Sequence, residues 1–323
     1  MPASSGDSGS CALNWIKVAN AQTDFNSARS TRGANASIPM SDLHEALHLT
    51  TARRAAKVTL VGAGPGDPEL LTIKAAKALA AASLVLYDHL VGKEVLELLP
   101  KSADRIYVGK ESGHHTLSQD GIIDLMLRLA RSGKPVLRLK GGDPYIFGRG
   151  GEEVQALAAA GVPFEVIPGI SAAQGAAAAA GMPLTHRDHA GAVVFATGHL
   201  RGKGDQRRVD LDWTMLARPH QTVVIYMGVG TLAVICAQLI AHGLPPDTPA
   251  ATIERATCAD QRTVVGTLTT LPTLALLHAV KPPALIMIGA VVALHDTLAP
   301  ANTARLDAAQ GRSPLVHVAS SIA

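Results

Sequence analysis

The sequence predicts an α/β fold with two domains, each built on a mostly parallel sheet flanked by helices. The chain has 323 residues, which is enough for two domains of ordinary size. Apolar residues make up 47% and aromatic residues only 3%, so the core must consist mainly of aliphatic side chains. Short β-rich apolar runs alternate with longer Ala- and Leu-rich segments, which is typical of βαβ units.

The first half of this pattern, residues 56–188, forms the predicted N-terminal domain. The predicted strands are Lys57–Val61, Leu84–Tyr87, Arg105–Val108, Val136–Leu139 and Phe164–Ile167. The predicted helices are Thr72–Ala82, Ser118–Ser132, Glu152–Ala160 and Ser171–Ala180. The alanine run in the last of these indicates a tightly packed helix, because Ala is the best helix former.

The second half, residues 189–297, forms the predicted C-terminal domain, and the polar segment Gly198–Trp213 lies near the change from one half to the other. The predicted strands are Val193–Thr197, Thr222–Tyr226, Ala250–Glu254, Arg262–Thr267 and Ala284–Ile288, with a helix at Gly230–Ala241. Residues 1–55 are expected to be a disordered extension with a short helix near Ser41 to Leu49, and residues 298–323 a flexible tail. An active cleft between the two domains is the simplest arrangement.

Composition narrows the class of protein. Lys and Arg number 29 and Asp and Glu 26, so bulk charge does not favour nucleic-acid binding. Three cysteines without a CxxC pair favour buried thiols in a reducing compartment over a disulfide or metal site. No apolar run of about 18 residues and no secretory signal are found, so we expect a soluble, cytoplasmic protein without a membrane partner.

Glycine-rich turns follow several predicted strands, where open α/β sheets bind their ligands. The turn Gly62-Ala63-Gly64-Pro65-Gly66-Asp67 lets the backbone approach a ligand, although a tight strand-to-helix turn explains it equally well. It does not match the dinucleotide pattern G-x-G-x-x-G, so NAD is not expected. The turn Gly141-Gly142-Asp143 is the stronger signal, because two adjacent glycines after an apolar strand indicate main-chain contact with a bulky ligand. Asp143 can bind amino or hydroxyl groups of a ligand, cap the next turn, or do both.

Longer motifs in the same order and spacing carry a family resemblance. The runs VTLVGAGPGDPELLT, LVLYDHLV, VGK, RLKGGDPYIFGRGGEE, VIPGISAA, GMPLTHRD, TGHL, VIYMG and PALIMIG resemble the uroporphyrinogen-III C-methyltransferases of the tetrapyrrole methylase family. The resemblance covers about residues 56–297. It implies a two-domain fold, a homodimer, and S-adenosylmethionine bound between the domains.

The resemblance also implies roles for individual residues. Asp88 would be the proton acceptor and Lys110 the proton donor. The implied cofactor contacts are Pro65, Gly141, Gly142, Asp143, Ile146, Ser171, Ala172, Met227 and Ala256. Family members often have Gly where this chain has Ala256, which a backbone contact would tolerate.

The reaction implied is the S-adenosylmethionine-dependent methylation of uroporphyrinogen III at C2 and C7, giving precorrin-2 through precorrin-1 for sirohaem or cobalamin synthesis. The alternatives are another precorrin methyltransferase, a ribosomal-RNA methyltransferase of the same fold, and a dinucleotide-binding oxidoreductase. Some family members carry a preceding oxidase and iron-insertion module. Only about 55 residues precede the methylase pattern here, so we expect neither NAD nor metal chemistry.

The substrate implied is a small-molecule tetrapyrrole with eight carboxylates, so its site needs cations. Arg can take a carboxylate with two parallel hydrogen bonds. The candidates in or beside the motif turns are Lys110, Arg138, Lys140, Arg149, His186 and Arg187.

One motif points to different chemistry. His44-Glu45-Ala46-Leu47-His48 matches H-E-x-x-H, which on a helix can hold zinc. It lies in the low-complexity extension without an evident third ligand, so a chance match is favoured and no metal is expected.

Overall fold

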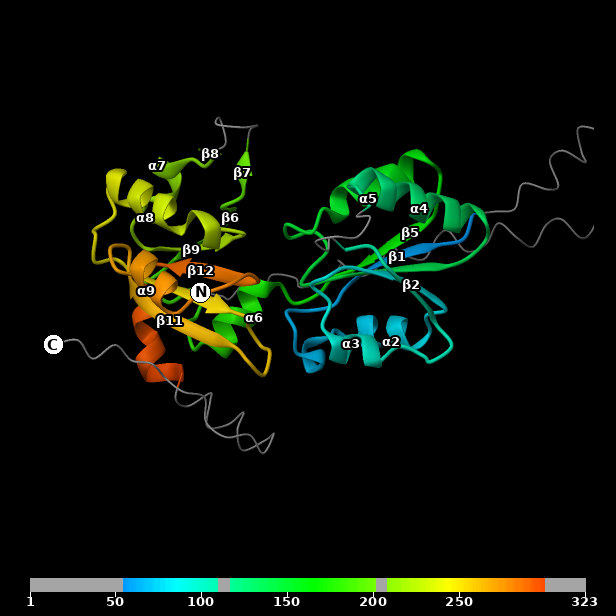
Figure 1. Cartoon of the computed structure of the whole chain (residues 1–323), viewed down its shortest axis with the longest axis horizontal. Helices are drawn as coiled ribbons and strands as arrows, with labels where there is room; N and C mark the ends of the chain where they lie inside the picture. Colours follow the sequence, from blue (N-terminus) through cyan, green and yellow to red (C-terminus); the bar gives the residue numbers. More distant parts are fainter. Residues whose placement is uncertain (1–54, 110–116, 202–207, 300–323) are drawn as a thin grey trace, which may run out of the picture. The chain divides into compact units, whose positions relative to one another are not determined.

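The computed structural model describes residues 55–109, 117–201 and 208–299. The expectations for the two tails therefore fall almost entirely outside the described residues. The same holds for the H-E-x-x-H motif of His44 to His48 and for Lys110. The described residues form two five-stranded sheets and a short two-stranded ribbon, β7 (Leu200–Arg201) with β8 (Arg208–Val209) (Figure 1).

The first sheet is entirely parallel, as the sequence predicts, with the order β3-β2-β4-β1-β5. The five strands are β1 (Val58–Gly62), β2 (Leu84–Tyr87), β3 (Asp104–Tyr107), β4 (Val136–Lys140) and β5 (Phe164–Ile167). The central pair, β4 and β1, is paired from Val58 with Val136 to Gly62 with Lys140. All five strands therefore end at one edge of the sheet, and their following turns meet there.

Helices connect these strands and begin at polar caps. The helices are α2 (Ile73–Ala80), α3 (Lys93–Glu97), α4 (Gln119–Arg131), α5 (Gly150–Ala159) and α6 (Ala172–Ala179), with a single 3-10 turn at Pro68–Leu70. The side chains of Thr72 and Ser118 accept from the third backbone amide of α2 and α4, and α6 begins with a capping box between Ser171 and Gln174. These local signals explain why the predicted helices agree with the observed ones within two residues at most ends.

Strand residues of the first sheet alternate between two buried layers, as the period of a β-strand requires. Leu60 and Leu86 pack with Met126 of α4 and Leu157 of α5. On the other face, a cluster that includes Val61, Val85 and Leu139 packs against α2 and α3. Figure 1 shows α4 and α5 on one side of the sheet and α2 and α3 on the other.

The second sheet corrects the prediction of a mostly parallel arrangement. Its order is β11-β10-β12-β9-β6, and of the adjacent pairs only β6 with β9 is parallel. Its strands are β6 (Ala192–Thr197), β9 (Gln221–Tyr226), β10 (Pro249–Glu254), β11 (Arg262–Thr267) and β12 (Ala284–Ile288). The turn from Glu254 to Arg262 is too short for a crossover, which a parallel pair requires, so β10 and β11 form an antiparallel hairpin.

Short helices were missed for a physical reason. The segments α3, α7 (Trp213–Leu216) and α9 (Leu271–Leu277) are too short to show a repeating apolar pattern. The predicted helix at Gly230–Ala241 is a 3-10 turn at Val229–Thr231 followed by α8 (Leu232–Ala241). Among the residues described, no helix is both long and apolar enough to cross a bilayer.

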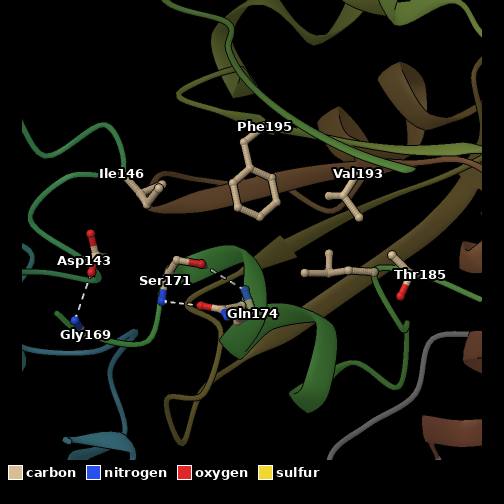
Figure 2. A pocket seen from close by; sticks show the side chains of 9 residues that line it. Asp143, Ile146, Gly169, Ser171, Gln174, Thr185, Val193 and Phe195 are labelled. Carbon is tan, nitrogen blue, oxygen red and sulfur yellow. Dashed lines mark hydrogen bonds between the residues drawn. The ribbon is translucent and has the colours of Figure 1, made fainter. Parts of the chain in front are cut away.

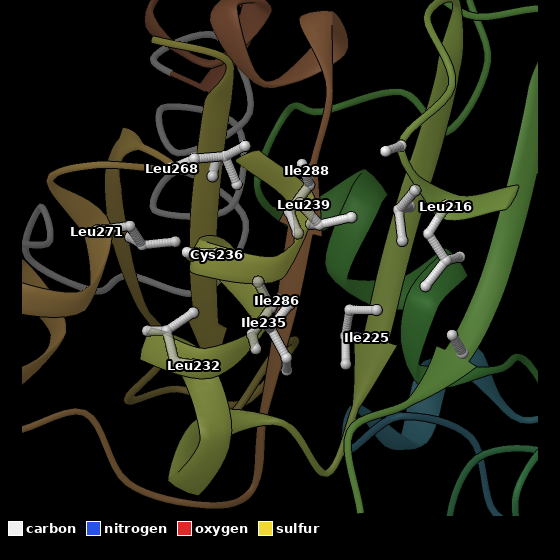
Figure 3. Packing of buried hydrophobic residues seen from close by; sticks show 14 of the residues in the cluster. Leu216, Ile225, Leu232, Ile235, Cys236, Leu239, Leu268, Leu271, Ile286 and Ile288 are labelled. Atoms are coloured by element: carbon white, nitrogen blue, oxygen red, sulfur yellow. The ribbon is translucent and has the colours of Figure 1, made fainter. Parts of the chain in front are cut away.

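The core of the second sheet lies under α8 and α9. Ile225 and Ile286 of the sheet pack with Ile235 and Leu239 of α8 and with Leu271 of α9 (Figure 3). Each of these five side chains is fully or almost fully buried. Aliphatic side chains therefore dominate this face, as the low aromatic content predicts, and Trp213 packs at its margin.

Replacing Leu239 by Ala should lower the free energy of unfolding by about 2–5 kcal/mol, since it leaves a cavity under α8. The matched control is Leu277→Ala on α9, where the side chain is 73% exposed and its loss should cost under about 0.5 kcal/mol. Urea denaturation followed by circular dichroism measures both. Equal losses in the two variants would contradict the packing described.

Candidate functional site

Three turns at the carboxyl edge of the first sheet touch through their backbones. A Cβ built on Gly62 would lie 2.5 Å from the amide nitrogen of Gly169, and one built on Gly169 would lie 2.3 Å from the carbonyl oxygen of Gly142. Gly64 and Gly142 also exchange two backbone hydrogen bonds, at 3.2 and 2.7 Å. The turns after β1, β4 and β5 can meet only because these positions carry no side chain.

The carboxylate of Asp143 fixes the same edge. One oxygen accepts from the amide of Tyr145 at 2.8 Å, and the other accepts from the amide of Gly169 at 3.0 Å. The side chain thus joins the turn after β4 to the turn after β5 (Figure 2). The sequence left two roles open for Asp143, which are capping the next turn and binding a ligand. The bond to the amide of Tyr145 is the cap, and Asp143 also lines the cavity described below, so both roles are compatible with this geometry.

The turn after β1 packs against the hairpin turn between β10 and β11. The hydroxyl of Thr257 accepts from the amide of Asp67 at 3.1 Å. A Cβ on Gly175 of α6 would lie 2.5 Å from Pro65, so Pro65 rests directly on that helix. Ala256 is buried beside this contact. Pro65 and Ala256, which lie far apart in sequence, are therefore close in space.

Tyr226, at the end of β9, ties the second sheet to α6. Its hydroxyl accepts from the backbone amide of Ala173 at 3.0 Å, and its ring lies 4.7 Å from that of Phe147 and 6.0 Å from that of Phe195. Burial raises the pKa of Tyr226, so the phenol stays protonated at neutral pH. The next residue, Met227, has a φ of 55° and is half exposed.

An open cavity of about 460 Å³ lies beside the first turn of α6 (Figure 2). Figure 2 shows Ile146, Phe195 and Val193 on one side of it, with Ser171 and Gln174 opposite. The lining residues are Asp143, Ile146, Gly169, Ser171, Gln174, Leu184, Thr185, Val193 and Phe195. Cavities of this size, apolar with a few polar groups, commonly bind small molecules.

The predicted cofactor residues lie around this region in two groups. Asp143, Ile146 and Ser171 line the cavity itself. Gly141 and Gly142 belong to the turn that carries Asp143, and Ala172 begins α6 beside Ser171. Pro65, Met227 and Ala256 lie on the neighbouring turns and do not line the cavity. Their role as ligand contacts stays a prediction.

Asp88, the predicted proton acceptor, stands at the end of β2 and is held by two contacts. One oxygen accepts from the amide of Leu90 at 3.2 Å, and the other lies 3.2 Å from Nη2 of Arg138. The side chain of Asp88 is 24% exposed, so it remains open to a ligand. Leu90 lies against Gly141, which places Asp88 next to the turn after β4.

Two of the predicted substrate cations have another role in the structure. Arg138 and Lys140 are buried, at 2% and 3% exposure, and both contact Oε1 of Glu153, at 3.3 and 3.1 Å. Burial, and then the positive charge of Arg138, lowers the pKa of Lys140. Both cations face α4 and α5 and not solvent, so the prediction that they bind substrate carboxylates does not fit the structure.

The other predicted cations remain exposed enough to meet a substrate. Arg149 begins α5 with a φ of 58° and forms two hydrogen bonds to Glu152, at 2.9 and 2.6 Å. His186 and Arg187 follow Thr185, which lines the cavity, and Arg187 is exposed. His186 accepts from the amide of Asp188 at 3.1 Å and stacks near His189. Lys110 lies outside the described residues.

Sequence reasoning missed Glu153 and the apolar side of the cavity. Arg138 and Lys140 are two residues apart on a strand that is buried on both faces, so their side chains lie on the same face. Two buried cations on one face require a buried anion beside them. That signal was present in the sequence. Phe195 and Val193 on β6 and Leu184 in the preceding loop gave no comparable signal, since apolar residues usually belong to the core. Within the described residues, no group of three or more His, Cys, Asp or Glu could hold a metal ion.

The parallel sheet, the glycine turns at its carboxyl edge and the cavity beside α6 together define an α/β protein that binds a small molecule. The sequence matches the family of tetrapyrrole (corrin/porphyrin) methylases over residues 57–272. The chain therefore belongs to the tetrapyrrole methylases, as the motif resemblance predicts.

Known proteins resemble the chain at two levels. A siroheme synthase of Nitrosospira multiformis is 56% identical over 243 residues, covering 75% of this chain and 51% of that protein. The chain thus spans about half the length of the curated relatives it matches. The uroporphyrin III C-methyl transferase of Thermus thermophilus is 43% identical with a TM-score of 0.62, covering 74% of this chain and 100% of that one.

Two further structures extend the comparison. The same Thermus enzyme complexed with S-adenyl homocysteine has a TM-score of 0.63. The cobalt precorrin-4 methyltransferase CbiF is 29% identical with a TM-score of 0.64, covering 73% of this chain and 95% of that one.

Adding one methyl group at Gly169 should open the contact between the three turns. The new Cβ of Gly169→Ala would lie 2.3 Å from the carbonyl oxygen of Gly142, so we expect a loss of about 1–3 kcal/mol in unfolding free energy. Gly151→Ala is the control, because nothing lies within 4 Å of its Cβ and Ala favours helix α5. Thermal unfolding compares them, and a Gly169→Ala melting temperature equal to that of the control would refute the contact.

Proposed function

We propose that this chain transfers methyl groups from S-adenosylmethionine to C2 and C7 of uroporphyrinogen III, giving precorrin-2 by way of precorrin-1. The observation that carries the proposal is the 43% identity to a uroporphyrin III C-methyl transferase over the whole of that chain. The motifs around Asp88, Asp143 and Arg187, which the sequence places in this class, support it.

The cavity beside α6 fits S-adenosylmethionine in size and chemistry. Ile146, Val193 and Phe195 offer an apolar surface to an adenine ring or a thioether. Asp143 and Ser171 offer oxygen atoms to hydroxyl and amino groups. The glycines beneath them keep the turn backbones free of side chains, so backbone amides and carbonyls can also reach the ligand. In support, S-adenyl homocysteine is the ligand named in a structure of the Thermus relative.

S-Adenosylmethionine, when bound, would supply a methyl group attached to a positively charged sulfur. The pyrrole carbon provides the electron pair of the new bond, and the sulfur keeps the electron pair of the bond that breaks. The protein then has two tasks, which are orientation and proton removal. The methylated ring carries a positive charge and must lose one proton. Asp88 is the proposed acceptor, because it is partly exposed and held in a fixed orientation by Arg138 and the amide of Leu90. Lys110 stays the proposed proton donor.

The substrate carboxylates require exposed cations on the walls of the site. We propose Arg149, His186 and Arg187 for this task, since they lie on the turns that carry the cavity residues Ile146 and Thr185. We further propose a homodimer working in the cytoplasm, and sirohaem synthesis as its destination, because the curated relatives are named siroheme synthases.

A second candidate function is the methylation of a later precorrin. The structural similarity to CbiF, described as a cobalt precorrin-4 methyltransferase, favours it. Incubation of the chain with uroporphyrinogen III and S-adenosylmethionine distinguishes the two. The proposal predicts the absorbance of precorrin-2 together with two equivalents of S-adenosylhomocysteine. If the chain does not methylate uroporphyrinogen III but does methylate a later precorrin, the second candidate function replaces the first.

Asp88→Asn should lower kcat by about 100-fold or more, which is the usual loss when a general base is removed. Binding of S-adenosylhomocysteine, measured by calorimetry, should stay within about twofold because Asp88 does not line the cavity. Asp124→Asn on the exposed face of α4 is the control for charge and should leave kcat unchanged. Full turnover by Asp88→Asn would remove Asp88 from its role.

Salt should weaken the binding of the substrate more than the binding of the cofactor. Uroporphyrinogen carries eight carboxylates, whereas S-adenosylmethionine carries only a single net positive charge, so screening acts mainly on the former. Raising NaCl from 50 to 500 mM should therefore increase the KM for uroporphyrinogen severalfold and leave the KM for S-adenosylmethionine nearly constant. Steady-state kinetics at fixed pH measure both, and parallel changes would argue against a site that binds carboxylates through cations.

A further inference from the structure

A charge cluster is buried between the first sheet and helices α4 and α5. Glu153, on α5, has no exposed surface, and its Oε1 accepts from Arg138 Nε at 3.3 Å, Lys140 Nζ at 3.1 Å and Gln119 Nε2 at 3.1 Å. Its other oxygen, Oε2, is buried without a hydrogen-bond partner among the described residues. We call the partly exposed Asp88 and the buried Arg138, Lys140 and Glu153 the charge quartet.

The strand period explains why these side chains meet. Leu84, Leu86 and Asp88 lie on one face of the β2 chain, and Val136, Arg138 and Lys140 lie on the same face of β4. Leu86 pairs with Arg138 across the two strands. The apolar rows that pack against α4 and α5 therefore end in charged residues at the carboxyl edge. There the helices provide Gln119 and Glu153 in place of further apolar contacts.

Stability is a poor explanation for this cluster. Burying charges costs several kcal/mol per ion, and well-packed apolar residues of similar volume are often as stabilising as a buried ion pair. A buried carboxylate oxygen without a partner adds to that cost. The cluster lies against the side chain of the proposed proton acceptor, and Arg138 contacts both Glu153 and Asp88. A role in holding Asp88 in place explains why the chain tolerates the free-energy cost of burying these charges.

We propose that Glu153 is a positioning residue for Asp88, acting through Arg138, and that it balances the charge of Lys140 so that Asp88 works in a neutral quartet. This inference rests on the proposed function in one respect, which is the role of Asp88 as proton acceptor. Two cations and two carboxylates cancel when all four are ionised. Arg138 is fixed from both sides, by Glu153 at Nε and by the carbonyl of Leu139 at Nη1, 3.0 Å away, which leaves Nη2 directed to Asp88.

Glu153→Gln keeps the shape of the side chain and removes its charge. The quartet then has an excess positive charge beside Asp88, which favours the carboxylate form. The acid limb of the kcat profile should therefore move to lower pH, by about half a unit or more. We expect kcat to fall about tenfold with an unchanged Kd for S-adenosylhomocysteine, since a small misplacement of a catalytic group costs one to two orders of magnitude.

The double variant Glu153→Gln/Lys140→Met separates positioning from folding. It removes one charge of each sign, so the acid limb should return toward its wild-type pH and kcat should recover at least in part. Arg138, the cation that contacts Asp88 from β4, is left unsubstituted in all variants. Glu97→Gln, on the exposed surface of α3, is the control for loss of a carboxylate.

The kinetics are measured with whichever tetrapyrrole the wild-type chain methylates, alongside crystal structures of the two variants. The inference expects Arg138, which loses its Glu153 contact at Nε, to move in Glu153→Gln and to carry Asp88 with it. It is overturned if Asp88 keeps its position, or if kcat falls with no movement of the acid limb and no recovery in the double variant. Failure of the proposed base is distinct, because it shows as full turnover by Asp88→Asn.

Discussion

The backbone contact among Gly62, Gly142 and Gly169 is the constraint on which the site depends. Gly62 ends β1, Gly142 and Gly169 lie in the turns after β4 and β5, and any side chain at Gly62 or Gly169 would overlap a neighbouring backbone. Because the turns lie so close, one carboxylate, that of Asp143, can bond to two of them. The first turn of α6 follows directly, and with it the polar side of the cavity.

Charge at this edge is divided between two environments. Arg138, Lys140 and Glu153 are enclosed by the sheet and by α4 and α5, where water cannot screen them. Arg149 and Arg187 are exposed, on turns that border the cavity. The enclosed charges can fix the orientation of a neighbouring group, whereas the exposed ones can bind and release a charged ligand. Asp88 lies at the boundary and contacts the enclosed set through Arg138.

The second sheet contributes differently from the first. Its strands run in both directions, and it reaches the site through side chains on β6 and β9 and through the turn between β10 and β11. Phe195 and Val193 form an apolar wall of the cavity, and the hydroxyl of Tyr226 bonds to α6. This chain thus combines a parallel sheet rich in glycine turns with a second sheet that supplies apolar cover.

Local sequence determined the strands, most helices, the glycine turns and the family, because period, caps and turn residues act over a few neighbouring positions. It also showed that Arg138 and Lys140 share one face of a buried strand, which required a buried anion. Only the tertiary structure decided that this anion is Glu153, how the strands of the second sheet pair beyond the β10–β11 hairpin, and that Phe195 faces a cavity. Those outcomes depend on which distant segments pack together, and a pattern of a few neighbouring residues does not specify that packing.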